Sequence, residues 1–231
     1  MVLPQKEEKA MVKKVYINPG HSDKDPGAVG YETERKLNVK VSEYQRDHLL
    51  ANYHCQVRMN PGTMGDLADI AKDANNWGAD LFVSNHFNAG KGNGYEALVY
   101  NEMRRELGEI FEKFVKEAGQ NSRGVKLRPG LAVLRLTNMP AVLNEGAFVD
   151  NKKDIQDWNE DHELKKLGIA YAEAAAEYLK LEKKVVAPAT EETNVVYRVQ
   201  VGAYRELANA EDMLKKLEKS GFPGIITKVV K

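Results

Sequence analysis

The sequence predicts an α/β fold, with a mixed, largely parallel sheet flanked by helices on both faces and a small C-terminal β-α-β module. Short apolar runs suited to buried strands alternate with longer segments whose apolar residues recur at helical spacing. A segment without aromatic residues, 183–194, has the composition of a linker, and another strand–helix–strand pattern follows it. The 231 residues suffice for one large core and a small second module. We therefore expect a domain at 12–182, a linker at 183–194 and a module at 195–231.

Each element of the expected first domain has its own signal in the chain. Apolar runs predict six strands, at 14–18, 55–59, 81–85, 96–101, 131–136 and 140–148. Helical spacing of apolar residues predicts helices at 37–50, 65–78, 103–118 and 155–181. Gly78 is a stop signal for the second helix, and Asp150-Asn151 is a cap for the last. In such sheets, ligands bind at the loops that leave the strand ends.

Composition excludes several classes of partner and site. Lys plus Arg and Asp plus Glu both number 34, so the net charge is zero and gives no support for a nucleic acid or an anionic membrane as partner. A single cysteine, Cys55, rules out an internal disulfide and a Cys-rich zinc site, and its flanks fit a packed small residue at a strand edge. The N-terminal segment is charged and resembles no secretory signal, and no stretch is long and apolar enough for membrane insertion. We expect synthesis in the cytoplasm.

Three residues at strand exits or helix starts are candidate metal ligands. His21 follows the first strand, Glu34 lies at the entry to the first helix, and His86 ends the strand that begins at 81. Two imidazoles and one carboxylate are a common ligand set for catalytic zinc, which leaves a fourth position for water. A lone histidine at a strand end is more often a hydrogen-bonded core or loop residue, and no HExxH motif is present. Spacing alone leaves both interpretations open.

A fourth candidate, Glu145, lies in a strongly apolar predicted strand. A carboxylate is costly to bury unless it is paired, coordinated or protonated. One interpretation is a structural salt bridge to an arginine such as Arg135. The other is a general base whose basicity is raised by apolar surroundings and which removes a proton from a water molecule. Residue chemistry does not separate the two.

Five sequence blocks resemble, in order, the zinc-dependent N-acetylmuramoyl-L-alanine amidases of the amidase-3 family. They are INPGHSDKDPGAVG, ERKLN, ADLFVSNHFNAG, RPGLAVLRLTNMPAVLNEGAF and VDNKKD, and the resemblance covers about residues 12–181. It implies that His21, Glu34 and His86 hold Zn²⁺ and that Glu145 is the catalytic glutamate. Glu32 is a nearby carboxylate, but Glu34 stands in register with the E-x-x-L-N block.

The resemblance implies a peptidoglycan hydrolase that cleaves the amide between N-acetylmuramic acid and L-alanine. A phage endolysin or a mother-cell autolysin would reach the cell wall after release from the cell. Two alternatives stay open: a non-catalytic peptidoglycan-binding protein, and another zinc hydrolase of the wall, either a peptidase or a deacetylase.

The loops around the candidate ligands carry turn signals. We expect Pro19-Gly20 to turn the chain sharply and to aim His21 at the metal, and Asp25-Pro26-Gly27 to stiffen the same loop. Asn85 and Asn88 flank His86, and either could support a metal ligand. Loop capping is the interpretation we favour for both.

The C-terminal segment resembles the first half of the SPOR domain, a peptidoglycan-binding module. The pattern is V-x-V-G-A-Y followed by A-x-A-x-x-x-L-x-x-L, with strands expected at 196–201 and 225–230 and a helix at 208–217. A whole module of this kind has two such halves. We expect two copies of the chain to complete each other's sheet, giving a homodimer through residues 195–231. The alternative is a segment that packs on the first domain or stays mobile.

Overall fold

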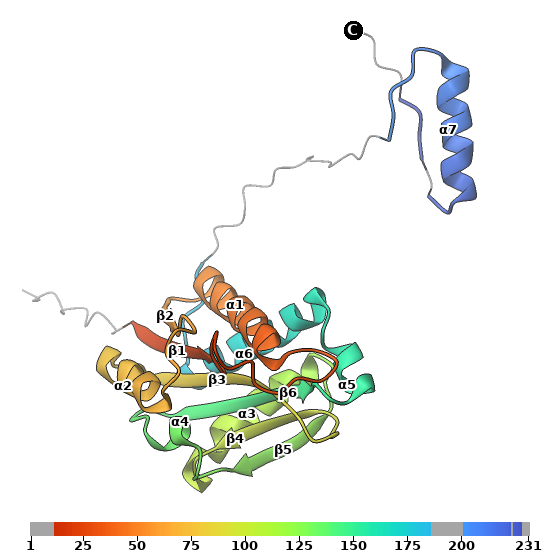
Figure 1. The fold of residues 1–231 in the computed structure, drawn as a ribbon. Helices are drawn as coiled ribbons and strands as arrows, with labels where there is room; N and C mark the ends of the chain where they lie inside the picture. Colours follow the sequence, from red (N-terminus) through yellow and green to blue (C-terminus); the bar gives the residue numbers. More distant parts are fainter. Residues whose placement is uncertain (1–11, 186–200, 223, 228–231) are drawn as a thin grey trace, which may run out of the picture. The chain divides into compact units, whose positions relative to one another are not determined.

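The computed structural model describes residues 12–185, 201–222 and 224–227 (Figure 1). The chain divides into two compact units, Met1–Val186 and Ala187–Lys231. The larger unit is an α/β layer structure, and the smaller one contains a single described helix. None of the described helices is both long and apolar enough to cross a membrane.

The larger unit is built on one sheet of six strands. The strands are β1 (Lys13–Pro19), β2 (Cys55–Met59), β3 (Leu81–Asn88), β4 (Tyr95–Val99), β5 (Ser122–Leu127) and β6 (Ala141–Phe148). Their order across the sheet is β2-β1-β3-β6-β4-β5. Only the β4–β6 pair is antiparallel, so the predicted mixed, largely parallel sheet is confirmed.

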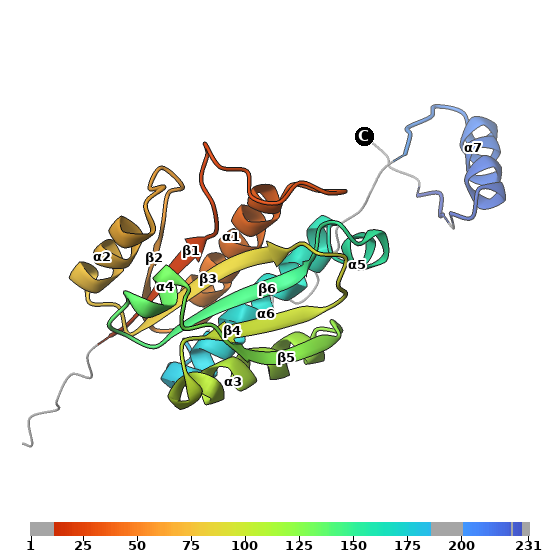
Figure 2. The same cartoon turned by 60° about the horizontal axis from the view of Figure 1, so that its bottom comes forward.

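Helices cover both faces of this sheet. They are α1 (Glu34–Asn52), α2 (Leu67–Trp77), the 3-10 turn η1 (Glu102–Arg104), α3 (Arg105–Glu117), α4 (Ala132–Arg135), α5 (Lys152–Asp157) and α6 (Asp161–Leu179). Helices α1, α3 and α6 pack together on one face, while α2 and α4 lie on the other (Figure 2). Gly78 ends α2 in a left-handed conformation, as predicted, because glycine adopts positive φ without steric cost.

Alternation along the strands gives each face its own apolar core. On β3, Val83 belongs to the core under α1, α3 and α6, whereas Phe82 belongs to the core under α2 and α4. Leu98 and Leu143, on β4 and β6, also face α2 and α4. The parallel strands are therefore apolar on both sides, as expected for a sheet sandwiched between helices.

Two predicted elements differ from the structure, and one strand of the structure is absent from the prediction. Residues 131–136, predicted as a strand, contain helix α4, because Val133 and Leu134 pack toward α2. Strand β5 was not predicted, because its sequence is short and charged and contains Gly124. The long helix predicted at 155–181 is two helices, which separate where Trp158 turns into the core. Asn151 caps the first of these, accepting hydrogen bonds from the backbone N–H groups of Lys153 and Asp154.

The smaller unit contains helix α7 (Leu207–Lys219), which agrees with the predicted helix at 208–217. Its described neighbours, 201–206 and 224–227, form no strand, so the strand prediction is wrong there. A strand requires a hydrogen-bonded neighbour, and the structure describes none beside them. The rest of the two predicted strands lies outside the described residues.

The first residues of the predicted linker contact the larger unit. Lys183 forms an isolated bridge with Tyr53, and the backbone N–H of Lys184 donates to the carbonyl of Asn52. The remainder of the predicted linker lies outside the described residues.

Candidate metal centre

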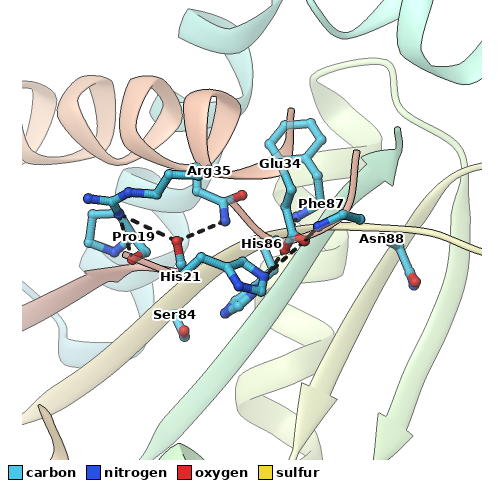
Figure 3. Close-up of polar contacts among 12 residues, drawn as sticks. Pro19, His21, Glu34, Arg35, Ser84, His86, Phe87 and Asn88 are labelled. Carbon is cyan, nitrogen blue, oxygen red and sulfur yellow. Dashed lines mark hydrogen bonds and ion pairs between the residues drawn. The ribbon is translucent and has the colours of Figure 1, made fainter. Parts of the chain in front are cut away.

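The structure brings His21, Glu34 and His86 together at one edge of the sheet (Figure 3). His21 lies just beyond the end of β1, Glu34 is the first residue of α1, and His86 lies near the end of β3. Strands β1 and β3 are adjacent and parallel, so their carboxyl ends meet at the same edge. Candidate donor atoms of the three side chains all lie within 4.8 Å of one another. This cluster could hold a metal ion.

Glu34 connects the two histidines. Its Oε2 lies 2.9 Å from Nε2 of His21, and its Oε1 lies 2.8 Å from Nδ1 of His86. The same carboxylate accepts backbone N–H bonds from Ala28 at 2.9 Å and from Phe87 at 3.3 Å. The two imidazole rings are 5.0 Å apart between centroids, with planes inclined by 71°. Backbone donors therefore fix the orientation of the carboxylate independently of the histidines.

Two glycines allow the cluster side chains to pack closely, because a Cβ at either position would collide with them. A Cβ on Gly20 would lie 2.2 Å from the His86 ring, and a Cβ on Gly27 would lie 2.5 Å from His21 and 2.6 Å from Glu34. Gly27 also has a φ of 69°. His21 itself has a φ of 66°, which is uncommon for a residue with a side chain. The turn predicted at 19–20 is thus followed by a left-handed residue whose imidazole reaches Glu34.

Residues at the start of α1 hold the His21 loop in place, and the sequence interpretation missed them. Arg35 donates from Nη1 to the carbonyls of Pro19 and Gly20, at 3.1 and 3.4 Å. Asn38 is fully buried and donates to the same Gly20 carbonyl at 3.2 Å. Both belong to the ERKLN block, so the block that supplies Glu34 also supplies the groups that fix the opposite loop (Figure 3).

Asp25 has a role beyond the turn that was predicted for it. Its Oδ2 lies 2.8 Å from Nδ1 of His21, and its Oδ1 accepts the backbone N–H of Gly27 at 3.0 Å. A carboxylate on the second nitrogen of an imidazole orients the ring and leaves the first nitrogen for a metal. The spacing of four residues between His21 and Asp25 is the sequence signal for this pair.

The electrostatics of the cluster favour a negatively charged Glu34. Burial by itself would raise the pKa of Glu34, but hydrogen bonds with His21 and His86 hold it below its usual range. The hydrogen bond with Glu34 raises the pKa of His21 to about 9 against an opposing effect of burial, and Asp25 adds to the rise. A proton on His21 is thus favoured by the neighbouring carboxylates of Glu34 and Asp25. A cation at the same point would be favoured in the same way.

Glu145 lies beside the cluster on β6. It is opposite His86 in the parallel pairing with β3 and opposite Glu96 in the antiparallel pairing with β4. Burial raises the pKa of Glu145 to about 8, and the carboxylates of Glu34 and Glu96 act in the same direction. Its Oε2 is buried without a hydrogen-bond partner among the described residues.

The salt-bridge interpretation of Glu145 is wrong. Arg135 is exposed on α4, and no ion pair joins it to Glu145 within the part of the chain that the structure describes. An unpaired buried carboxylate oxygen is rare and calls for a functional explanation.

The two asparagines beside His86 differ in role. Asn88 accepts the backbone N–H of Ala89 at 2.8 Å, so it caps the loop as predicted. Asn85 does not cap a loop, because it is fully buried in β3 and donates to Ser42 and Gln45 of α1 at 2.9 and 2.8 Å. It thereby fixes α1, which carries Glu34, against the strand that carries His86. Glu32 points to Lys36, 3.0 Å away, and is outside the cluster.

Comparison with known proteins identifies the family. The sequence profile of N-acetylmuramoyl-L-alanine amidase matches residues 15–177, which include every strand of the sheet except the first two residues of β1. The chain belongs to the N-acetylmuramoyl-L-alanine amidase family. A second profile, that of the SPOR domain, matches residues 168–228 of the amidase and so begins within α6.

Individual relatives of the amidase come from bacteria and from a phage. The sporulation-specific N-acetylmuramoyl-L-alanine amidase of Bacillus subtilis is 30% identical over 222 residues, which cover 92% of this chain and 84% of that protein. The endolysin of Bacillus phage SPP1 is 34% identical over 187 residues, covering 75% of this chain and 69% of the endolysin.

A solved structure gives the same architecture. The catalytic domain of CwlV, an N-acetylmuramoyl-L-alanine amidase from Bacillus (Paenibacillus) polymyxa, matches with a TM-score of 0.70 at 28% identity. The match covers 74% of the amidase described here and all of the CwlV domain.

Proposed function

We propose that the chain hydrolyses the amide between N-acetylmuramic acid and L-alanine of peptidoglycan with a zinc ion held by His21, Glu34 and His86, and with Glu145 as the general base. Membership of the amidase family supports the reaction and the substrate. One structural observation supports both the zinc ion and the residue roles. Three donor side chains gather within 4.8 Å beside a buried carboxylate that has an unpartnered oxygen.

The residues present fit zinc. Two imidazoles and one carboxylate are a standard catalytic zinc set, and Gly20 and Gly27 allow these side chains to gather because a Cβ at either position would collide with them. Bound there, zinc would polarise the scissile carbonyl and make water available as hydroxide near neutral pH. Its positive charge would also lower the pKa of Glu145 and so favour the ionised, basic form of that side chain.

Glu145 transfers a proton from the attacking water to the leaving nitrogen. Its Oε2 accepts a proton from the attacking water as the water oxygen bonds to the lactyl carbonyl carbon. The same oxygen then delivers that proton to the alanine nitrogen as the carbon–nitrogen bond breaks. The products are a lactyl carboxyl group on the glycan, which releases the second water proton to solvent as it ionises, and a free L-alanine amine on the peptide. One carboxyl group therefore serves first as base and then as acid.

The relatives act in two settings, sporulation and phage lysis, judging by their names. We infer that this chain likewise acts on the cell wall. A phage endolysin and a mother-cell autolysin would both use the same site.

Digestion of purified peptidoglycan, followed by mass spectrometry of the products, tests the proposal. We expect intact stem peptides with a new L-alanine amine, their loss on treatment with a chelator, and their return when zinc is added. A new amine elsewhere in the peptide would indicate a peptidase, and loss of acetyl groups a deacetylase. Sedimentation with peptidoglycan without any product would indicate a non-catalytic binding protein. Any of these three results would contradict the proposal.

We propose further that residues 195–231 form a homodimer contact. In the described part of this segment, α7 has no buried residue, and Leu207, Phe222 and Ile225 are exposed. Pairing of two copies would cover such apolar side chains. Light scattering at micromolar concentration should give twice the chain mass. A mass of one chain would reject the dimer and would leave peptidoglycan as the binding target that the SPOR match indicates.

A further inference from the structure

A row of charged side chains crosses four neighbouring strands, starting at the metal cluster. His86 on β3 pairs in register with Glu145 on β6, and Glu145 pairs in register with Glu96 on β4. Nε of Arg123, on β5, lies 2.6 Å from Oε1 of Glu96. Residues opposite each other on adjacent strands point to the same face of a sheet. The four side chains therefore share one face.

Helices α2 and α4 cover only one end of this face. Leu98 and Leu143 lie on the same face, two positions from Glu96 and Glu145, and are buried in the core under α2 and α4. Figure 2 shows α2 and α4 over one end of the face, with β3, β6, β4 and β5 running out beyond them. Arg123 has 42% of its side chain exposed. The β5 end of the row is therefore the part that solvent reaches, because Lys126 beside it is also 30% exposed.

The far end of the row carries an excess positive charge. Glu96 is 5% exposed and pairs with both Arg123 and Lys126, while Asn88 donates to its second oxygen at 3.4 Å. Burial alone would raise the pKa of Glu96, but hydrogen bonds from Lys126 and Arg123 hold it low, so the group is ionised. One carboxylate and two cations leave a net charge of plus one.

The guanidinium of Arg123 is held in place, but not all of its nitrogen atoms have a hydrogen-bond partner among the described residues. Its guanidinium lies 5.3 Å from the ring centre of Phe148, which is buried, and its Nε is taken by Glu96. Its two η nitrogens have no hydrogen-bond partner among the described residues. A guanidinium held by an aromatic ring contact and by one hydrogen bond, with its terminal nitrogens free of partners, is suited to bind a carboxylate.

The spacing fits a short peptide. Strands in a sheet are about 4.8 Å apart, so the backbone of β5 lies roughly 10 Å from that of β6, which carries Glu145. The guanidinium reaches back toward β4 to meet Glu96, which shortens this span. An extended peptide advances about 3.3–3.6 Å per residue. A group on the second residue from the scissile amide would therefore lie within reach of Arg123.

We propose that Arg123 determines specificity by binding a free carboxylate on the second residue of the stem peptide. Glu96 acts as a positioning residue, because its carboxylate holds Nε of Arg123, and Lys126 pairs with that same carboxylate. This inference rests on the proposed amidase function. In peptidoglycans the second stem residue carries either a free carboxylate or a carboxamide, so the proposal predicts which of these two wall types is cleaved faster.

The test compares two soluble muropeptides that differ only at this group, isoglutamate against isoglutamine. We expect the zinc-loaded enzyme to favour the carboxylate substrate in kcat/KM by about 10- to 100-fold, the range for a charged hydrogen-bonded pair. Arg123→Gln should remove the preference by slowing cleavage of the carboxylate substrate alone. Arg123→Lys should keep part of it. Arg105→Gln, on α3 and therefore on the other face, is the matched control and should keep all of it.

The ratio of kcat/KM values for the two substrates is measured within each variant, so partial loss of folded protein cancels. Equal cleavage of both substrates by the unmodified enzyme would overturn the proposal, and so would an equal loss on both in Arg123→Gln. Either result leaves the amidase function intact. If the unmodified, zinc-loaded enzyme frees no L-alanine amine from either substrate or from whole peptidoglycan, the proposed function itself fails.

Discussion

Helix α1 carries a histidine–glutamate cluster at each end, and the two clusters differ in the partners of the glutamate. At its N-terminus, Glu34 contacts His21 and His86 at 2.9 and 2.8 Å. Near its C-terminus, His48 lies 2.6 Å from Glu173 of α6, whose second oxygen accepts the Tyr53 hydroxyl at 2.6 Å.

The C-terminal cluster is closed, in the sense that both carboxylate oxygens of Glu173 and both ring nitrogens of His48 already have partners. Tyr53 occupies the carboxylate oxygen that a second imidazole occupies at the other end, and Nδ1 of His48 contacts the Asn52 amide at 3.3 Å. No orphaned acid lies beside it among the described residues. The N-terminal cluster has a second imidazole, which makes three donor side chains, and it lies beside the unpartnered oxygen of Glu145. A histidine–glutamate pair alone is therefore structural, and the added donor with a free acid is what suggests chemistry.

The largest expected effect is the loss of both metal and activity when a donor is removed. Glu34→Gln keeps the side-chain shape but weakens the charge that binds the ion. We expect cleavage of peptidoglycan to fall by more than about 100-fold, because even residues that only orient metal ligands contribute 10- to 100-fold. Glu173→Gln, the same change in the closed cluster, is the control and should leave the rate unchanged. A rate loss in both variants would erase the distinction between the clusters.

Replacement of Glu145 should separate binding from catalysis. Glu145→Gln keeps the three donors and removes the group that moves the proton. We expect kcat to fall by about 10²- to 10⁴-fold, the usual contribution of a general acid–base residue, with zinc content unchanged. Product assays and metal analysis on the same sample measure both quantities. Full activity would mean that another group carries the proton.

The pH dependence of stability gives the next effect, in the metal-free protein. The pKa of Glu145 is about 8 in the folded state and about 4.5 when unfolded, so between these values only the folded chain keeps the proton. The free energy of unfolding must then fall as pH rises through this window. Glu145→Gln removes this term and should be more stable than the unmodified chain by about 3 kcal/mol at pH 7, with little difference at pH 4.

Urea unfolding at both pH values, after removal of divalent cations, measures the difference. An equal difference at pH 4 and pH 7 would show that the acid is not buried and neutral in the folded state.

The smallest effect belongs to the closed cluster. Burial would raise the pKa of Glu173, but Tyr53 and His48 hold it below its usual range, so the group is a paired anion. Tyr53→Phe removes one hydrogen bond and should cost about 1–2 kcal/mol of unfolding free energy, with kcat/KM unchanged. Thermal or urea unfolding with a parallel activity assay checks this. A change in kcat/KM larger than the loss of folded protein would connect this end of α1 to catalysis.

Much of the fold could be predicted because both faces of the sheet are covered. Strands such as β1 and β3 contain short apolar runs, Val15–Ile17 and Leu81–Val83, and these are easily recognised. Residues 131–136 illustrate the limit, since a six-residue apolar run fits a buried strand or a short helix equally well. Strand β5 illustrates the opposite case, because Arg123 and Lys126 make an edge strand appear to be a loop.

Only part of the site could be predicted from the sequence. His21, Glu34 and His86 could be predicted because they lie at ends of recognisable elements and match family blocks. The contacts that hold them could not, because Arg35 and Asn85 act across the gap between a helix and a strand distant in sequence. Only the folded chain brings such partners together.

Metal titration by calorimetry tests the central claim most directly. The metal-free chain, His86→Ala and His48→Ala are each titrated with zinc. We predict one tightly bound ion per chain for the unmodified protein and for His48→Ala, and weak or no binding for His86→Ala. Equal zinc binding by all three proteins, or loss of the ion in His48→Ala alone, would contradict the assignment of the metal centre to the N-terminal end of α1.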